Sequence, residues 1–217
     1  MHFLPISLTL FILFLVLVPV LFALAPAVAF AKLGLNPVLG YAFFLLCLVG
    51  SGVNIPVSRE RVEHEPPADE MAYFFTRYFG IRVPRVTERI IAVNLGGAVL
   101  PTLLSLYLLS LAPMGLVLVA TAIMTVAAFM LSRPVQGIGV VMPPFVPPVI
   151  AALVAMLISR EHAPQIAYIS GVMGTIIGAD VLRLGAFRRE KVQFLSIGGA
   201  GVFDGIYLVG LVSVLLA

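Results

Sequence analysis

Two aspartates, Asp180 and Asp204, lie inside the last two apolar stretches of the chain. A carboxylate within a membrane is costly, and it tends to face a cavity, a partner or a water path. Two carboxylates that meet in a poorly hydrated site cannot both ionise easily, so one stays protonated while the other can act as a base. Such a pair can activate water for peptide hydrolysis. The same pair can instead bind and release a proton or a cation during transport.

Asp180 also has a structural interpretation. Arg183 follows it by three residues, a spacing at which side chains on a helix form ordinary ion pairs. Asp204 has no basic neighbour at that spacing on its own stretch and is the stronger functional candidate. Gly174 and Gly178 are four residues apart, which favours close packing of this stretch against another helix.

The composition places the chain in a membrane. Hydrophobic residues make up 61% of the sequence and charged residues 11%, and the mean hydropathy is +1.15. The surface of a soluble domain of this length could not be hydrated with so few polar residues. The lipid bilayer is therefore the first expected partner.

Several classes of ligand lack support in the sequence. The net charge of +3 is small and no basic stripe with interleaved aromatics is present, which argues against nucleic acid. Cys47 is alone in an apolar run, so we expect neither a disulfide nor a metal site. The histidines, His2, His64 and His162, are scattered, and no phosphate-binding glycine loop appears. We therefore expect no metal and no cofactor.

Seven apolar stretches predict an all-α polytopic transmembrane helix bundle forming one domain over residues 1–217. The spans cover about 4–31, 37–56, 89–111, 114–131, 147–159, 164–183 and 194–217. The first lacks a basic leader and is interpreted as a retained helix. Residues 57–88 form a polar spacer, interpreted as a partly helical, solvated connector of mixed charge in preference to a docking segment or lid.

Basic residues set the expected orientation, because cytoplasmic loops are enriched in them. Lys32 and Arg160 fall on one side, and all the basic residues of the longer loops fall on the other. We therefore expect a cytoplasmic N-terminus and an external C-terminus. The residues on the cytoplasmic side are Arg59, Arg61, Arg77, Arg82, Arg85, Arg89, Arg133, Arg183, Arg188, Arg189 and Lys191.

This topology gathers the intramembrane polar groups in the cytoplasmic half, where they would form an acidic pocket for a substrate or an ion. The Pro-rich run at 140–148 cannot form an ordinary helix. It is either a re-entrant loop that offers free backbone to a substrate or an interfacial turn that begins the fifth span. The pocket candidates besides the two aspartates are Asn54, Asn94, Gln136, Pro143, Pro144 and Arg183.

Two short motifs each occur twice in the sequence. Leu-Gly-Gly-Ala at 95–98 opens the third span, and Ile-Gly-Gly-Ala at 197–200 opens the seventh. Gly-Val-Asn-Ile at 52–55 similarly matches Gly-Ala-Asp-Val at 178–181. Many transporters are built from repeats, but chance similarity between Gly/Ala-rich membrane segments is the favoured interpretation.

Over most of its length the chain resembles an uncharacterised integral-membrane family of bacteria and archaea. The segments that carry this resemblance are Gly-Ser-Gly-Val-Asn-Ile-Pro at 50–56, Gly-Ala-Asp at 178–180 and Ser-Ile-Gly-Gly-Ala-Gly-Val-Phe-Asp-Gly at 196–205. It implies a prokaryotic plasma-membrane location and no particular activity.

About a third of the chain also resembles the presenilin and prepilin-peptidase intramembrane aspartyl proteases, which carry one aspartate on each of two successive helices. Phe203-Asp204 is similar to their Tyr-Asp motif, and Gly-Ala-Asp at 178–180 to their Gly-x-Gly-Asp motif. The order is reversed here, Ala179 replaces the second glycine, and no Pro-Ala-Leu follows.

Three functions follow as hypotheses. The first is an intramembrane aspartyl-type hydrolase or protease that uses Asp204 and Asp180 on a membrane-protein substrate. The second is a proton- or cation-coupled small transporter or channel that uses the same residues. The third is a structural or accessory membrane protein without turnover.

Overall fold

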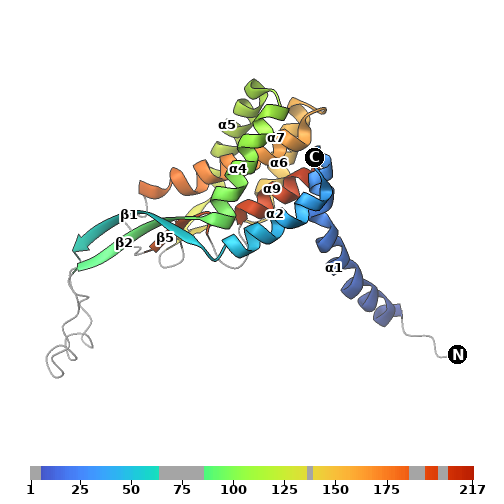
Figure 1. Ribbon diagram of the computed structural model, residues 1–217, viewed down its shortest axis with the longest axis horizontal. Coiled ribbons are helices and arrows are strands. Elements are labelled where there is room, and N and C mark those ends of the chain that lie inside the picture. The colour runs from blue at the N-terminus through green and yellow to red at the C-terminus, as the bar shows by residue number, and fades with distance from the viewer. Residues whose placement is uncertain (1–5, 64–85, 136–138, 186–193, 200–204) are drawn as a thin grey trace.

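The computed structural model describes residues 6–63, 86–135, 139–185, 194–199 and 205–217. Helices form most of this chain, and a small sheet extends from one end of the helical bundle (Figure 1). At the opposite end, the N-terminal helix projects away from the bundle (Figure 1). The helical bundle of the prediction is thus present, but an all-α fold is not, because strands occupy part of the polar spacer and its surroundings.

Helices occur at each of the seven predicted positions, although their lengths differ from the predicted spans. Among the described residues, α5 is long and apolar enough to cross a membrane, whereas the other apolar helical stretches are shorter. The seven crossings therefore remain a prediction. The helices are α1 (Ile6–Lys32), α2 (Pro37–Gly50), α4 (Leu100–Leu108), α5 (Met114–Leu131), α6 (Val146–Ile158), α7 (Ala163–Thr175) and α9 (Gly205–Leu216).

The sheet has the strand order β1-β2-β5. The strands β1 (Asn54–Glu63) and β2 (Val86–Asn94) pair in an antiparallel ribbon. The strand β5 (Phe194–Ile197) pairs with β2 in parallel, with Val93 opposite Ile197. A separate pair, β3 (Arg133–Val135) and β4 (Gly139–Val141), follows α5.

The strands correct three sequence predictions. The spacer 57–88 is extended rather than helical wherever it is described, and the third and seventh spans begin as strands. The residues of β2, rich in Val, Ile and Thr, explain the difference, because β-branched side chains favour strands over helices. Their apolar character extended the predicted helix into what is strand.

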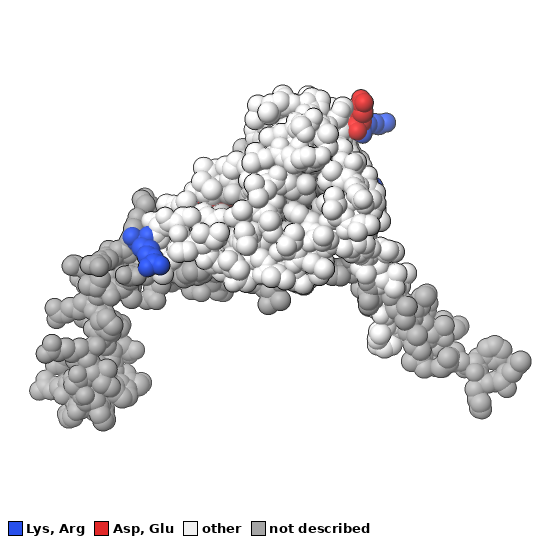
Figure 2. Space-filling view, viewed as in Figure 1, with Lys and Arg blue, Asp and Glu red and all other residues white. Residues whose placement is uncertain are grey.

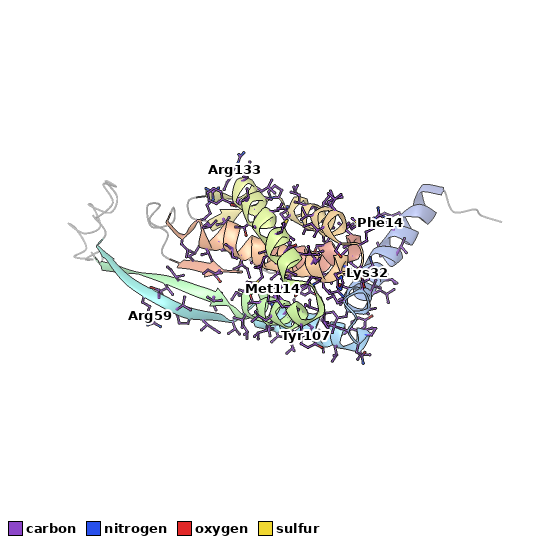
Figure 3. All side chains as sticks on the ribbon, turned by 90° about the horizontal axis from the view of Figure 1, so that it is seen from above. Phe14, Lys32, Arg59, Tyr107, Met114 and Arg133 are labelled. Atoms are coloured by element: carbon purple, nitrogen blue, oxygen red, sulfur yellow. The ribbon has the colours of Figure 1, made fainter. Side chains whose placement is uncertain are left out.

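Two short π-helical segments flank the point where the sheet meets the bundle. The segment η1 (Leu95–Val99) connects β2 to α4, and η3 (Ile176–Val181) extends α7. The helix α7 lies at the centre of the bundle, where it packs against α4, α5, α6 and α9. Figure 3 shows α5 running from Met114 toward Arg133, with Arg59 on the side of the sheet and Lys32 where α1 meets the bundle.

Glycines permit the closest approaches between these elements. A Cβ atom at Gly96, in η1, would collide with the backbone of α2 at Cys47 and of Ser51, just after it. A Cβ at Gly178, in η3, would collide with the Thr125 carbonyl of α5. Both neighbours are backbone atoms that cannot turn aside, so only glycine fits here.

We predict that Gly96→Ala lowers the free energy of unfolding by about 1–3 kcal/mol, as expected for overpacking against fixed backbone. Gly115→Ala is the matched control, since no atom lies within 4 Å of the added Cβ. It should leave stability unchanged or raise it by up to about 1 kcal/mol, because alanine is the better helix former. Thermal unfolding of the purified protein in detergent micelles measures both, and equal stability of the two variants would contradict the packing argument.

Candidate functional site

Asp180 lies in η3, at the end of the central helix. Its carboxylate Oδ2 accepts a hydrogen bond of 2.9 Å from the backbone N–H of Gly198. Gly198 comes directly after β5 and has a φ of +73°, a conformation that favours glycine. The contact joins the end of α7 to the segment that follows the edge strand of the sheet.

Arg183 does not pair with Asp180. Its guanidinium donates instead to the end of α5, with Nη2 at 2.6 Å from the carbonyl oxygen of Phe129 and 2.9 Å from that of Ser132. The guanidinium carbon also lies 4.0 Å from the centroid of the Phe129 ring. A cation at the C-terminus of a helix satisfies free carbonyls and complements the helix dipole. Arg183 therefore joins α7 to α5 and leaves Asp180 without this cation.

Asn94 is the polar centre of the junction between the sheet and the bundle. Its side chain is 1% exposed. The Nδ2 donates to the Ser51 carbonyl at 2.7 Å and to Asn54 Oδ1 at 3.1 Å, and the Oδ1 accepts from the Gly97 N–H at 2.9 Å. Asn94 thus connects the end of α2, the start of β1 and the first turn of η1.

Asn54 extends this network to β5. Its Oδ1 accepts from the Ser196 hydroxyl as well as from Asn94. Ser196 is two residues before Gly198, whose N–H donates to Asp180. The asparagines therefore fix the position of β5, and with it the amide that holds the carboxylate. Their polar atoms bond to one another, to backbone and to the Ser196 hydroxyl, an arrangement of support rather than of direct ligand binding.

The two prolines predicted for the site do not join this junction. Pro143 and Pro144 are exposed in the turn before α6, and Pro147 and Pro148 lie in the first turn of that helix. Proline is well tolerated there because the first N–H groups of a helix lack intrahelical partners. From Pro143 onward the run thus consists of a turn and the start of α6, and its position relative to a membrane remains a prediction.

Asp204 and Gln136 lie outside the described residues. The approach of Asp204 to Asp180 therefore remains a prediction. The helices α7 and α9 pack in opposite directions, so the described start of α9 lies toward the end of α7 that leads to Asp180. The Tyr168 ring of α7 lies against Gly210 of α9, and the Ser213 hydroxyl of α9 donates to the Ala167 carbonyl of α7.

Two residues of the junction were not identified as site residues from sequence. Gly198 was marked only by the repeated Gly-Gly-Ala motif, and Ser196 by no signal beyond its position in a family-like segment. In the structure the glycine pairs of the two copies each come after a strand, and those strands are parallel neighbours. A Cβ at Gly198 would lie 2.7 Å from the Ala98 Cβ, so the two copies contact each other.

The junction offers a carboxylate, backbone amides and neutral amide side chains. Within the part of the chain that the structure describes, no group of three His, Cys, Asp or Glu residues is placed to hold a metal ion. The chemistry that these residues can perform is proton transfer and hydrogen bonding at Asp180.

The fold and the site together define a class of protein. It is mainly helical, it has a small sheet, and a half-buried carboxylate lies where the sheet meets the helical bundle. A family model described as Protein of unknown function (DUF1614) matches residues 48–216, from the end of α2 to the end of α9. The chain belongs to this family. The searches of curated proteins and of solved structures found no match. The resemblance to an uncharacterised family is thus confirmed, whereas the comparisons give no support to a relationship with presenilin-type proteases.

We predict that Asn94→Asp destabilises the protein by at least about 1–3 kcal/mol, the cost of leaving buried hydrogen-bonding groups unsatisfied. The carboxylate cannot donate, and it would face the Ser51 carbonyl and Asn54 Oδ1 as a third acceptor. Asn36→Asp makes the same chemical change at the N-cap of α2, where Oδ1 only accepts from Val38 N–H. The unfolding midpoint should fall for Asn94→Asp and stay unchanged for Asn36→Asp. An unchanged midpoint for Asn94→Asp would refute the central role of Asn94 in the junction.

Proposed function

We propose that the protein is a membrane-embedded hydrolase of the aspartyl type, with Asp180 as one catalytic carboxyl and Asp204 as the other. The observation that supports this most directly is the hydrogen bond from the Gly198 N–H to Asp180 Oδ2. Gly198 is six residues before Asp204 in sequence. The bond therefore holds beside Asp180 a residue that is close in sequence to Asp204, which supports a shared site.

In this proposal the two carboxyls share the work of hydrolysing a peptide bond. The ionised carboxylate accepts a proton from water as the water oxygen attacks the carbonyl carbon, and the protonated carboxyl donates its proton to the carbonyl oxygen. The carboxyl that took the water proton then passes it to the nitrogen, the C–N bond of the tetrahedral intermediate breaks, and the other carboxylate accepts a proton from a hydroxyl of the intermediate. The Gly198 amide orients Asp180 throughout.

The apolar surface supports placing this site in a membrane. Large hydrophobic side chains are widely exposed on the projecting α1 and on the bundle, among them Phe14, Leu118, Val126, Met130 and Leu157. Contiguous apolar surface of this kind on a soluble protein would drive association. Figure 2 shows charged side chains near the sheet and at the opposite end, and an uncharged described surface between them on this face. In the orientation expected from the basic loops, the junction faces the cytoplasm of a prokaryotic cell.

A proton- or cation-coupled transporter is the second candidate, and the repeated motif favours it. The two copies of Gly-Gly-Ala follow parallel strands and contact each other across the junction. Parallel repeats with a site between them are a common design of transporters. A carboxylate beside the interface of the copies would then bind the coupled ion.

We predict that the full chain in lipid vesicles cleaves a single-span peptide carrying a quenched fluorophore, and that Asp180→Asn and Asp204→Asn each lower the rate at least about 100-fold, as expected for loss of an acid–base group. Glu161→Gln is the control, because Glu161 is exposed at the far end of the bundle. Mass spectrometry of the products locates the cleaved bond.

The same vesicles, loaded with a pH-sensitive dye, distinguish the alternatives. Dissipation of an imposed pH gradient that depends on Asp180, without cleavage, would replace the hydrolase by the transporter. The absence of both activities would leave an accessory role.

A further inference from the structure

Three buried side-chain oxygens in the described chain have no hydrogen-bond partner, and all three are on α7. They are Gln165 Oε1, the Tyr168 hydroxyl and the Thr175 hydroxyl. Tyr168 is 3% exposed and Thr175 is 2% exposed. A buried polar group without a partner is costly, and native proteins usually satisfy such groups with ordered water. That all of them lie on the helix that leads to Asp180 calls for a common explanation.

The three oxygens share one side of the helix. Gln165, Tyr168 and Thr175 are separated by three and seven residues, spacings that return to the same helical face. This face is directed toward α9, because Tyr168 and Val172 are the side chains that a Cβ at Gly210 would meet. The opposite packing surface, at Gly174 and Gly178, is occupied by α5.

The π-helical turn adds Asp180 to the same face. In an α-helix, a residue five positions beyond Thr175 would lie well away from it. In η3 the hydrogen bonds run from residue i+5 to residue i, as in the bond from the Leu182 N–H to the Ile177 carbonyl. This spacing places Asp180 directly one turn beyond Thr175. The polar positions therefore form two pairs, Gln165 with Tyr168 and Thr175 with Asp180.

Neighbouring polar groups provide the further contacts that a bound water needs. Gln165 is held in place because its Nε2 donates to the Leu33 carbonyl at 3.3 Å, which leaves Oε1 to accept from another donor. In the same pair, the Tyr168 hydroxyl can donate to a water that in turn donates to Gln165 Oε1. At the other pair, the Thr175 hydroxyl and the Asp180 carboxylate supply a donor and an acceptor.

We infer that α7 binds ordered water along its α9-facing side, one site at Gln165 and Tyr168 and a second at Thr175 and Asp180, and that these sites form a path for water to the carboxylate. From Gln165 to Asp180 the path follows fifteen residues, about 22 Å at the rise of an α-helix. Val172 lies between the two sites on this face. Delivery of the hydrolytic water to Asp180 rests on the proposed function, whereas the binding of water does not.

The first test is radiolytic hydroxyl labelling of the full chain in lipid nanodiscs, read by mass spectrometry, because radicals form from water at the protein surface and from bound water inside. Tyr168 should be labelled to an extent comparable with the exposed Tyr107, while the equally buried Ile169 stays unlabelled. A Tyr168 as unreactive as Ile169 would overturn the inference. Neither result depends on hydrolytic activity, so the water path and the proposed function can fail separately.

The second test uses the sign of a stability change. Thr175→Val and Tyr168→Phe remove the hydroxyls with little change of shape. If the hydroxyls bind water, the unfolding midpoint should fall or stay unchanged in both variants. If they are dry and unpartnered, both substitutions should raise the midpoint by about 2–4 °C or more, which would refute the inference. Tyr107→Phe, on the exposed surface, controls for the loss of a tyrosine hydroxyl.

Discussion

The buried amide of Asn94 is the interaction on which the rest of the junction depends. At this point a strand ends, a helix begins and the end of a second helix passes close by, so three sets of backbone groups lose their regular partners together. A single asparagine can satisfy all of them because it both donates and accepts. It binds the Ser51 carbonyl, the Asn54 side chain and the Gly97 N–H.

The hydrogen bonds of Asn94 also affect the position of Asp180, through the sheet. Asn94 positions Asn54, Asn54 positions Ser196, and two residues later the Gly198 amide meets the carboxylate. Each step is short and directional, whereas the apolar contacts of the bundle fix distance but not orientation. This series of hydrogen bonds therefore determines the orientation of the Asp180 carboxylate. The glycines at 96 and 198 are needed because backbone and side chains approach too closely there for a Cβ.

The sequence predicted the helices well because an apolar run must be buried or inserted in lipid whatever its neighbours are. The limits of α5 and α6 agree with the predicted spans to within about a residue. The strands were not predicted, because the Val- and Ile-rich residues of β2 are as apolar as a helical span and lack a clear alternation. The parallel pairing with β5 joins segments a hundred residues apart and has no local signal.

The candidate site was predicted in part for the same reason. Asp180, Asn94 and Asn54 could be identified because a polar residue next to apolar sequence is conspicuous. Their partners could not, because Gly198 acts through its backbone N–H, which every residue except proline carries. Arg183 illustrates the reverse error: its spacing from Asp180 suggested an ion pair, but the side chain follows the free carbonyls at the end of α5 instead.

The π-helical end of α7 accounts for both the isolation of Asp180 and its surroundings. Ion pairing at a spacing of three depends on the regular rotation of an α-helix, and η3 departs from that rotation between Ile176 and Val181. The π-helical geometry also places Asp180 one turn beyond Thr175, on the face of α7 that carries the unpartnered oxygens. π-Bulges are frequent at functional sites, and here one change of helical geometry removes a cation from a carboxylate and supplies it with a polar neighbour. A regular helix with this sequence would have favoured the ion pair, and the carboxylate would then have been a structural group like Arg183 itself.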